Sequence, residues 1–391
     1  METLPGRTLE AARALFPHIA QGKIYLDHAG TSPLSTRVVG AITAYMEERS
    51  RGRLDTYPLD LLMVAECRAM LQRVVNAESP ERIAFAGSTT DAINIVASGL
   101  RWKSGDRIIL GDIEFPANVY PFLNLRRLGV ELDVLHAPDG SMTPEMIAGA
   151  LAPRTRLVAL SAVQYLSGYR ADLAAIGEMT RRRGIVFAVD GIQAAGAVRL
   201  DVQEMKIDAL AAGGQKWLMA PHGSAFLYLT EELQSRIEQA NLGWLSVETP
   251  WDFHNFTQPL ASSARRYECG SLNTPGLWGL HASLMTLLEF DPAATEAHLL
   301  AITGTLMSEL RLIPEVRIIS PAATRERAGI VTVEADATFD LKLLLKRMAE
   351  RRITIALRRG LLRFSPHFYN SPEDMVTAAG ALRDCLRAGS G

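Results

Sequence analysis

The sequence has no large excess of charge of one sign and no long apolar run. Its 41 lysines and arginines are balanced by 43 aspartates and glutamates, so the formal net charge is −2. A surface that binds nucleic acid or an anionic membrane usually carries a broad basic field, so we expect neither partner. No run of about eighteen apolar residues occurs, which argues against a membrane span. The expected partner is a small molecule held in a pocket.

Cysteine is scarce, and the three cysteines are far apart in the sequence. Cys67, Cys269 and Cys385 fit neither a disulfide framework nor a zinc site. The histidines show no metal-ligand spacing, so we expect no metal. The first residues, METLPGRTLEAARALF, lack the basic-then-apolar layout of a secretory signal and are typical of a short amphipathic helix. We therefore expect a cytoplasmic protein.

Two common nucleotide-binding motifs are also missing. No G-x-G-x-x-G follows a predicted strand, which argues against a nicotinamide-dependent dehydrogenase. No G-x-x-x-x-G-K-[ST] occurs either, which argues against a P-loop NTPase.

Short apolar strands alternate with amphipathic helices from Arg82 to about residue 230. The predicted strands are RIAFAG, RIILGD, LDVLHA, RLVALSAV, GIVFAVDG, DALAAGG and GSAFLYL. The alternation is typical of a doubly wound α/β fold. Continuous apolar strands are typical of a sheet that is buried on both faces. We therefore expect an α/β protein whose large domain contains a mostly parallel seven-stranded sheet.

The pattern changes after residue 285. Strands are expected near 316–319, 330–334, 353–357 and 361–365, and helices at 339–351 and 372–387. This set predicts a smaller C-terminal α+β domain. We expect the domains to be an N-terminal segment that is part of the small domain (1–23), the large domain (24–285) and the small domain (286–391).

Polar residues follow three of the predicted strands, where ligands bind in an open α/β sheet. Thr89 and Thr90 follow RIAFAG at a helix start, where hydroxyls and free N–H groups can hold a phosphate or simply cap the helix. Asp190 ends GIVFAVD and could keep a bound pyridine nitrogen protonated, or cap the next helix. Lys216 lies in apolar sequence, so burial would lower its pKa and suit it to imine formation. The alternative is a lysine whose amine reaches the surface.

The order of these segments resembles that of fold type I enzymes that use pyridoxal 5′-phosphate (PLP). In detail the chain is similar to the class V aminotransferase family, which includes cysteine desulfurases, isopenicillin N epimerase-like proteins and kynureninase. Further similar segments, from Ile24 to the C-terminal helix, are YLDHAGTSP, EFPANV, SGYRADL, VDGIQAAG, GGQKWLMAPHG, YECGSLNTPG and LRFSPHFYN. The resemblance implies the PLP-dependent transferase fold type I.

The resemblance also implies a role for each matching residue. Lys216 matches the lysine that forms the Schiff base with PLP, Asp190 the partner of the pyridinium nitrogen, and Gln193 the partner of the phenolic oxygen. Thr89 and Thr90 match the turn that binds the phosphate.

Two further matches concern the neighbouring subunit and the substrate. Ser271 matches a residue that reaches the phosphate of the neighbouring subunit, which implies a homodimer with shared active sites. Arg363 matches the arginine that binds the α-carboxylate of an amino-acid substrate, for which a guanidinium fork is well shaped. The alternative for Arg363 is a salt bridge within the small domain.

The chain departs from cysteine desulfurases at several positions. Phe115 replaces a histidine that stacks on the cofactor, Gln215 replaces a histidine before the lysine, and Tyr165 replaces an asparagine near the ring. All three are expected to contact PLP, although Tyr165 could instead line the substrate pocket or merely pack. The segment ITIALRRGLLRF has no cysteine and no room for the loop that carries the desulfurase nucleophile.

The substrate pocket is less well defined by the sequence. His28 and Ala29 could face the substrate, with a hydrogen-bonded turn histidine as the alternative for His28. The aromatic-rich segment 243–259 could form the pocket or the dimer interface.

We expect an enzyme that acts on an amino acid by transamination or by β-elimination, as a C–S lyase without a cysteine nucleophile. The alternatives are an isopenicillin N epimerase-like enzyme, a cysteine desulfurase that lacks the usual loop cysteine, and a PLP-binding module without turnover.

Overall fold

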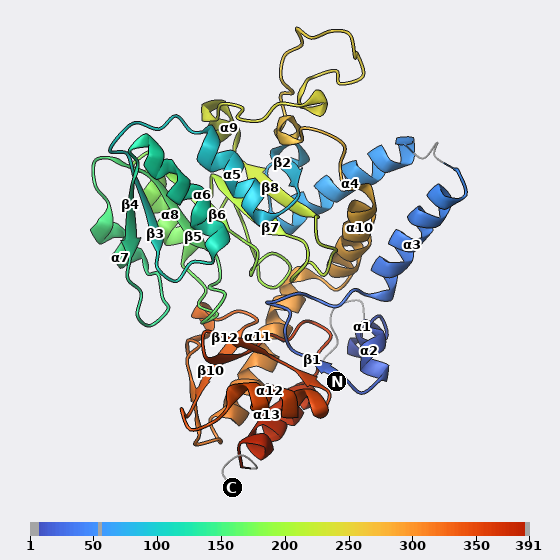
Figure 1. Ribbon diagram of the computed structural model, residues 1–391, viewed down its shortest axis with the longest axis vertical. Helices are drawn as coiled ribbons and strands as arrows, with labels where there is room; N and C mark the ends of the chain where they lie inside the picture. Colours follow the sequence, from blue (N-terminus) through green and yellow to red (C-terminus); the bar gives the residue numbers. More distant parts are fainter. Residues whose placement is uncertain (1–7, 54–56, 388–391) are drawn as a thin grey trace.

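The computed structural model describes residues 8–53 and 57–387, and within them a large sheet has seven strands. Its spatial order is β2-β8-β7-β6-β5-β3-β4 (Figure 1). The strands are β2 (Ile83–Ala86), β3 (Arg107–Gly111), β4 (Glu131–Leu135), β5 (Thr155–Ser161), β6 (Val186–Asp190), β7 (Ala209–Gly213) and β8 (Ala225–Leu229). All neighbours are parallel except β8, which is antiparallel to both β2 and β7. The expected mostly parallel seven-stranded sheet is confirmed.

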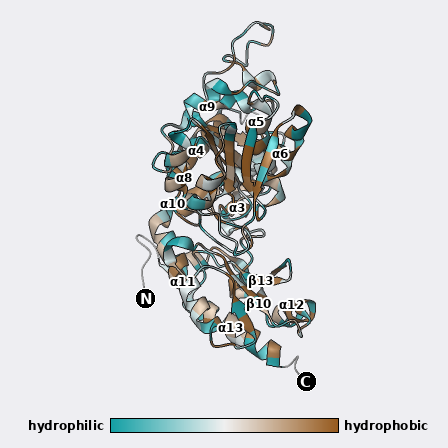
Figure 2. Ribbon diagram, turned by 90° about the vertical axis from the view of Figure 1, so that its left-hand side faces the viewer, coloured by the Kyte–Doolittle hydropathy of each residue, from teal (hydrophilic) through white to brown (hydrophobic). Residues whose placement is uncertain are grey.

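The continuous apolar character of these strands has a direct structural cause. Successive residues such as Leu157 and Val158 contribute to two different hydrophobic clusters, because side chains along a strand point to opposite faces. Both faces of the sheet are therefore buried under helices, except at the edge strand β4, which is partly exposed. Figure 2 shows the result, with hydrophobic strands enclosed by helices of mixed polarity.

Helices and short helical turns connect the strands and surround the sheet. The α-helices are α3 (Thr36–Ser50), α4 (Tyr57–Val75), α5 (Thr89–Gly99), α6 (Tyr120–Leu123), α7 (Pro144–Ala150), α8 (Leu173–Arg181), α9 (Glu231–Arg236) and α10 (Thr274–Glu289). The 3₁₀ turns are η1 (Pro80–Arg82), η2 (Pro116–Asn118), η3 (Asn124–Leu128), η4 (Trp244–Ser246) and η5 (Ala264–Tyr267). A loop closed by a bridge between Val247 and Leu260 projects from the large sheet region (Figure 1).

The C-terminal part contains, within the described residues, a separate four-stranded antiparallel sheet of order β12-β13-β10-β9. Its strands are β9 (Val316–Ile318), β10 (Val331–Ala335), β12 (Ala356–Arg358) and β13 (Leu361–Phe364). The turn η6 (Thr324–Glu326) and the helices α11 (Pro292–Leu310), α12 (Leu341–Glu350) and α13 (Pro372–Arg387) complete this part.

One strand expected at 353–357 is divided between two sheets. Ile353–Thr354 form β11, which pairs with β1 (Ile24–Tyr25), whereas β12 pairs with β13. The chain thus changes partner at Ile355. This change depends on a strand about 330 residues earlier in the sequence, which a local pattern does not reveal.

The N-terminal segment packs against the C-terminal part. It contains α1 (Leu9–Arg13) and α2 (Pro17–Ala20). Arg13 forms an ion pair with Asp374 at 2.7 Å, and the Phe16 ring stacks on Tyr369 with 3.9 Å between the centroids. These contacts support the division that we propose, with 1–23 joined to the small domain 286–391 and with 24–285 as the large domain. Residues 1–7 and 388–391 of that division lie outside the described residues.

Across residues 8–53 and 57–387, no helix combines the length and the apolar character that crossing a membrane requires.

Candidate active site

Asp190 is the last residue of β6, and Lys216 lies just beyond the neighbouring strand β7, so both are at the carboxyl edge of the large sheet. The Lys216 residue is 9% exposed, so it is not a surface lysine. Burial lowers the pKa of Lys216 to about 8, and the nearby Asp190 carboxylate opposes this shift. Burial likewise raises the pKa of Asp190 to about 7, against the effect of Lys216. The pair therefore provides an amine that is easily deprotonated next to a buried carboxyl group.

Two aromatic rings lie beside the lysine. The Nζ atom of Lys216 is 5.4 Å from the centroid of the Phe115 ring. The Tyr165 ring meets Phe115 edge to face, with 5.4 Å between the centroids. Phe115 is 42% exposed, so one side of its ring remains accessible. The structure therefore places Phe115 beside Lys216 and Tyr165 beside Phe115.

The start of α5 has the features of a phosphate site. Ser88 caps this helix by accepting the N–H of Asp91. The hydroxyl of the next residue, Thr89, is buried and has no hydrogen-bond partner within the described ranges. A buried hydroxyl without a partner is unfavourable, and the first N–H groups of a helix also lack intrahelical partners. An anion bound here would satisfy both. Thr90 is half-buried beside it.

Gln193 is tied to the lysine segment. Its Oε1 accepts the indole N–H of Trp217 at 2.8 Å, and its Nε2 donates to the carbonyl of Ala29 at 3.1 Å. A side-chain amide has two N–H donors, so one remains for a ligand oxygen. Gln215 is half-buried next to Lys216, and its carbonyl accepts the N–H of Ser32 at 2.9 Å.

His28 and Ala29 are buried rather than open to a pocket. The two ring nitrogens of His28 are hydrogen-bonded, Nδ1 to Ser32 Oγ at 2.6 Å and Nε2 to the Tyr369 hydroxyl at 2.8 Å. The N–H of Ala29 donates to Ser365 Oγ at 3.0 Å. This geometry favours the alternative stated for His28, a hydrogen-bonded turn histidine.

Arg363 is buried and already paired. Its Nη2 donates to Asp27 Oδ1 at 2.9 Å, and its Nη1 donates to the carbonyl of Tyr165 at 2.8 Å. Its Nε is buried without a partner in the part of the chain that the structure describes. A guanidinium has five N–H donors, so the salt bridge leaves donors for a substrate carboxylate. The salt bridge is therefore not within the small domain, as the alternative for Arg363 expected, but joins Arg363 to Asp27 of the large domain.

Two site residues were missed by sequence reasoning. Asp27 pairs with Arg363 across 336 residues of sequence. Glu114, buried next to Phe115, accepts hydrogen bonds from Ser161 and from the side-chain amides of Gln164 and Asn118. The segments IYLDHA and EFPANV, in which they occur, were the available signals.

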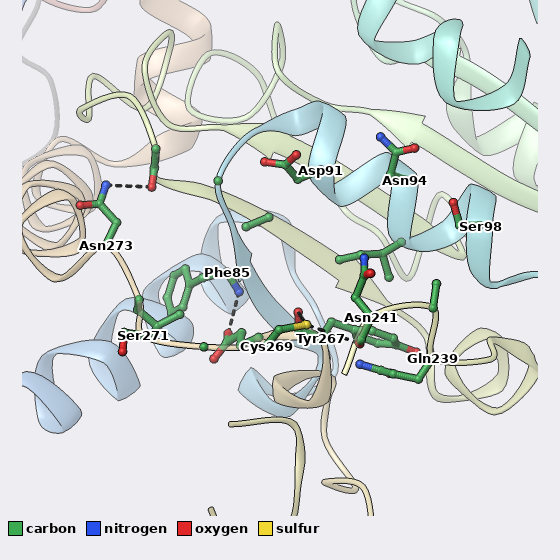
Figure 3. Close-up of a pocket in the computed structure, with 18 of the residues that line it drawn as sticks. Phe85, Asp91, Asn94, Ser98, Gln239, Asn241, Tyr267, Cys269, Ser271 and Asn273 are labelled. Carbon is green, nitrogen blue, oxygen red and sulfur yellow. Dashed lines mark hydrogen bonds between the residues drawn. The ribbon is translucent and has the colours of Figure 1, made fainter. Parts of the chain in front are cut away.

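Ser271 lies apart from the residues around Lys216. It is exposed and lines a cavity of about 760 Å³ that extends along one face of α5 (Figure 3). Asn273, in the same cavity, donates to the carbonyl of Gly223 at 3.0 Å. Neither Lys216 nor Asp190 lines this cavity.

The residues present fit PLP. The partnerless Thr89 hydroxyl suits a phosphate, and Asp190 is placed to hold a pyridine nitrogen. Lys216 has the lowered pKa that imine formation requires.

The fold and this arrangement are typical of a PLP-dependent enzyme, and the family match confirms the expected cofactor. The family described as Aminotransferase class-V matches residues 24–374, and the chain belongs to that family.

Several known proteins are similar over most of the chain. A probable cysteine desulfurase of Methanothermobacter thermautotrophicus is 34% identical over 266 residues, which are 67% of this chain and 66% of that protein. The isopenicillin N epimerase of Streptomyces clavuligerus is 30% identical over 93% of this chain and 96% of the epimerase.

Solved structures show the same fold. The complex of the cystine C–S lyase C-DES with its reaction product cysteine persulfide superposes with a TM-score of 0.85 at 25% identity, covering 94% of this chain and 99% of the lyase. The apo cysteine desulfurase of Thermococcus onnurineus has a TM-score of 0.88 at 24% identity, with coverage of 97% and 98%.

Proposed function

We propose that the protein cleaves a C–S bond of a sulfur-containing L-amino acid by β-elimination, with transamination as the competing outcome. The observation that carries the proposal is the buried Lys216, whose pKa is lowered to about 8 beside Asp190. Bound PLP supplies the electron sink that makes a Cα proton removable. An amine with this pKa can accept that proton near neutral pH.

Each residue has a defined task in this proposal. Arg363 binds the α-carboxylate through the donors that Asp27 and Tyr165 leave free, which orients the Cα–H bond. Lys216 Nζ takes the Cα proton, and the Phe115 ring, with Tyr165 at its edge, lies beside this amine. With cystine, loss of the Cβ–S bond and addition of one water give pyruvate, ammonia and cysteine persulfide.

The placement of the cysteines supports elimination over desulfurase chemistry. Cys67 is buried in α4, and Cys385 is buried in α13. Cys269 is half-buried, lines the cavity of Figure 3 and lies near the carbonyl of Asn241. Arg359 and Gly360 alone connect β12 with β13, so no loop carries a cysteine there. The sulfur atom would therefore leave on the product. The similarity to a cystine C–S lyase agrees with this.

Epimerisation is the second candidate, because the chain is 30% identical to an isopenicillin N epimerase. Epimerisation needs a second acid on the face of Cα opposite Lys216. Phe115 cannot act as an acid, and both nitrogens of His28 are engaged. Tyr165, whose ring contacts Phe115, is the residue that would have to serve.

We also propose a homodimer in which Ser271 completes the partner's phosphate site. Ser271 is exposed in its own chain and borders the cavity beside α5 (Figure 3). Large apolar side chains are exposed on α3, α4, η4 and the projecting loop: Met46, Tyr57, Leu59, Leu61, Leu62, Trp244, Trp251, Phe253 and Phe256. An exposed apolar surface of this kind is typical of a subunit interface. This interpretation also accounts for the aromatic residues of segment 243–259.

None of the three cysteines forms a disulfide, which supports the cytoplasm as the location.

The test is a product assay with the purified, PLP-loaded protein. L-cystine, L-cysteine and L-alanine are offered, and pyruvate, ammonia, sulfide, the D-isomer and transferred amino groups are measured. Pyruvate and ammonia from cystine that disappear in Lys216→Ala would support the lyase. Amino transfer alone would select transamination, and a D-isomer would select the epimerase. Absence of every product would leave a PLP-binding module without turnover, and sulfide from cysteine would select a desulfurase that lacks the usual loop cysteine.

A further inference from the structure

The backbone around Lys216 is held by three hydrogen bonds from distant parts of the chain. The N–H of Ser32 donates to the carbonyl of Gln215 at 2.9 Å, and its hydroxyl donates to the carbonyl of Lys216 at 2.5 Å. His367 Nε2 bonds to the carbonyl of Trp217 at 2.9 Å. Three consecutive carbonyls are therefore bound by the turn after β1 (residues 27–32, the N-terminal turn) and by the small domain.

The direction of each hydrogen bond follows from the chemistry of the groups. A backbone carbonyl only accepts, so Ser32 must give its single hydroxyl proton to Lys216. The Ser32 oxygen then accepts from His28 Nδ1, which must carry a proton. In a neutral imidazole the other nitrogen is an acceptor, so the Tyr369 hydroxyl donates to His28 Nε2. Burial lowers the pKa of His28 well below its usual range, which keeps the ring neutral.

His367 has a defined tautomer by the same reasoning. Its Nε2 must donate to the Trp217 carbonyl, and its Nδ1 accepts the N–H of Phe368 at 2.7 Å. Burial lowers the pKa of His367 to about 4, so this ring is also neutral.

Tyr369, the last residue in this series of hydrogen bonds, is held in place by the N-terminal segment. The Tyr369 ring is stacked on Phe16, and the carbonyl of Tyr369 accepts a hydrogen bond from Arg13 at 3.1 Å. Tyr369 also lies six residues after Arg363, the proposed carboxylate ligand. The same segment of the small domain thus carries the substrate contact and the support of the lysine.

The turn that follows Lys216 has a strained backbone, which explains why it needs these hydrogen bonds. Met219 donates its N–H to the carbonyl of Lys216 at 2.9 Å and has a positive φ of 49°, which is unfavourable for a non-glycine residue. A turn of this kind persists only where surrounding contacts hold it.

We propose that Tyr369, His28 and Ser32 are positioning residues that orient Lys216 through its backbone carbonyl. The proposal rests on the proposed role of Lys216 as the PLP anchor and catalytic amine. The residues act in series, so loss of any one link weakens the restraint that the Ser32 hydroxyl places on the Lys216 carbonyl.

The experiment compares five variants of the PLP-loaded protein, the fifth being Ser32→Thr, which keeps the hydroxyl. Tyr369→Phe and Ser32→Ala each break one link, and the double variant breaks both. Tyr228→Phe is the matched control. Tyr228 lies in β8 and is as buried as Tyr369, and its hydroxyl donates to Glu78 at 3.0 Å rather than to a residue that contacts Lys216. The measured quantities are kcat and KM for L-cystine, the visible circular dichroism per bound PLP, and the unfolding temperature.

Loss of either link should lower kcat about tenfold, the usual effect of one hydrogen bond that orients a reacting group. KM should change little, because Arg363 is untouched, and the visible circular dichroism should fall. The double variant should behave like the worse single variant, because both substitutions break the same series. Tyr228→Phe should keep kcat and the dichroism, whatever its unfolding temperature. Ser32→Thr, which restores the hydroxyl, should recover kcat.

Two results would overturn the proposal: additive losses in the double variant, or a Tyr369→Phe protein indistinguishable from Tyr228→Phe. If the wild type does not turn over cystine, the proposed reaction fails. The dichroism of the same variants then still decides whether the chain of hydrogen bonds orients Lys216.

Discussion

Replacing Asp27 with asparagine tests whether Arg363 is a buried cation that needs a carboxylate partner. The Arg363 side chain is 2% exposed and the Asp27 side chain 17% exposed, with Nη2 and Oδ1 2.9 Å apart. Removing one partner of a buried ion pair costs roughly 3–5 kcal/mol, because the other charge stays buried. Asp27 is partly exposed, and asparagine keeps an acceptor oxygen. We therefore expect a loss of about 3 kcal/mol in the free energy of unfolding.

The assay is urea unfolding of the wild type, Asp27→Asn and a control, Asp133→Asn. The Asp133 side chain is also 17% exposed, but its partner Arg107 is 34% exposed, so water can compensate the remaining charge. The control should therefore lose much less stability than Asp27→Asn.

A second measurement adds acetate, with chloride at the same ionic strength as the reference. A ligand that binds only the folded state stabilises it in proportion to its affinity. Acetate should stabilise Asp27→Asn more than the wild type, because it replaces the lost carboxylate beside Arg363. Equal small losses in both variants, with no specific effect of acetate, would refute the assignment of Arg363 as a carboxylate site.

Three further substitutions test other parts of the site. Asp190→Asn should make the PLP-free protein more stable at pH 8. Burial raises the pKa of Asp190 from 3.8 to about 7, so the wild type loses stability as the pH rises from 3.8 to 7. In urea unfolding, the extra stability of Asp190→Asn over the wild type should therefore disappear as the pH falls towards 4. Thr89→Val should stabilise the PLP-free protein, because it removes a buried hydroxyl that has no partner in the described residues. The same substitution should raise the Kd for PLP about tenfold or more in an absorbance titration, because the phosphate loses a donor. A lower stability of the PLP-free protein together with an unchanged Kd for PLP would contradict the phosphate role. Phe256→Asp, at a side chain that is 92% exposed, should shift the protein towards monomer in analytical ultracentrifugation without loss of secondary structure, and an unchanged sedimentation coefficient would argue against an interface there.

The sequence predicted the large sheet and placed the candidate residues Asp190 and Lys216 at its edge, because both inferences depend on local patterns. Most of the strands are continuously apolar, Asp190 is the last residue of β6, and Lys216 comes shortly after β7. The family resemblance, which the family match confirms, then supplied PLP.

What the sequence did not predict depends on contacts between distant segments. The pairing of Asp27 with Arg363 and the change of sheet at Ile355 both join the N-terminal turn to the last strands. The sequence did not decide between the two interpretations of His28 for the same reason, because one of its two partners is 341 residues away and the other four. Glu114 was missed since a buried carboxylate that only accepts hydrogen bonds has no periodic signature.

The position of the N-terminal turn has a consequence for how the protein is made. The carbonyl of Leu26 accepts the N–H of Ser365, the N–H of His28 donates to the Ser365 carbonyl, and Phe16 stacks on Tyr369. Chains begin to fold from their N-terminal side during synthesis, at a rate of roughly 5–20 residues per second. Residues 16–28 must therefore remain without these partners until Ser365 and Tyr369 have been translated. A chain released before Ser365 would carry Lys216 and Asp190 on a complete sheet and still lack the segment that closes around the lysine.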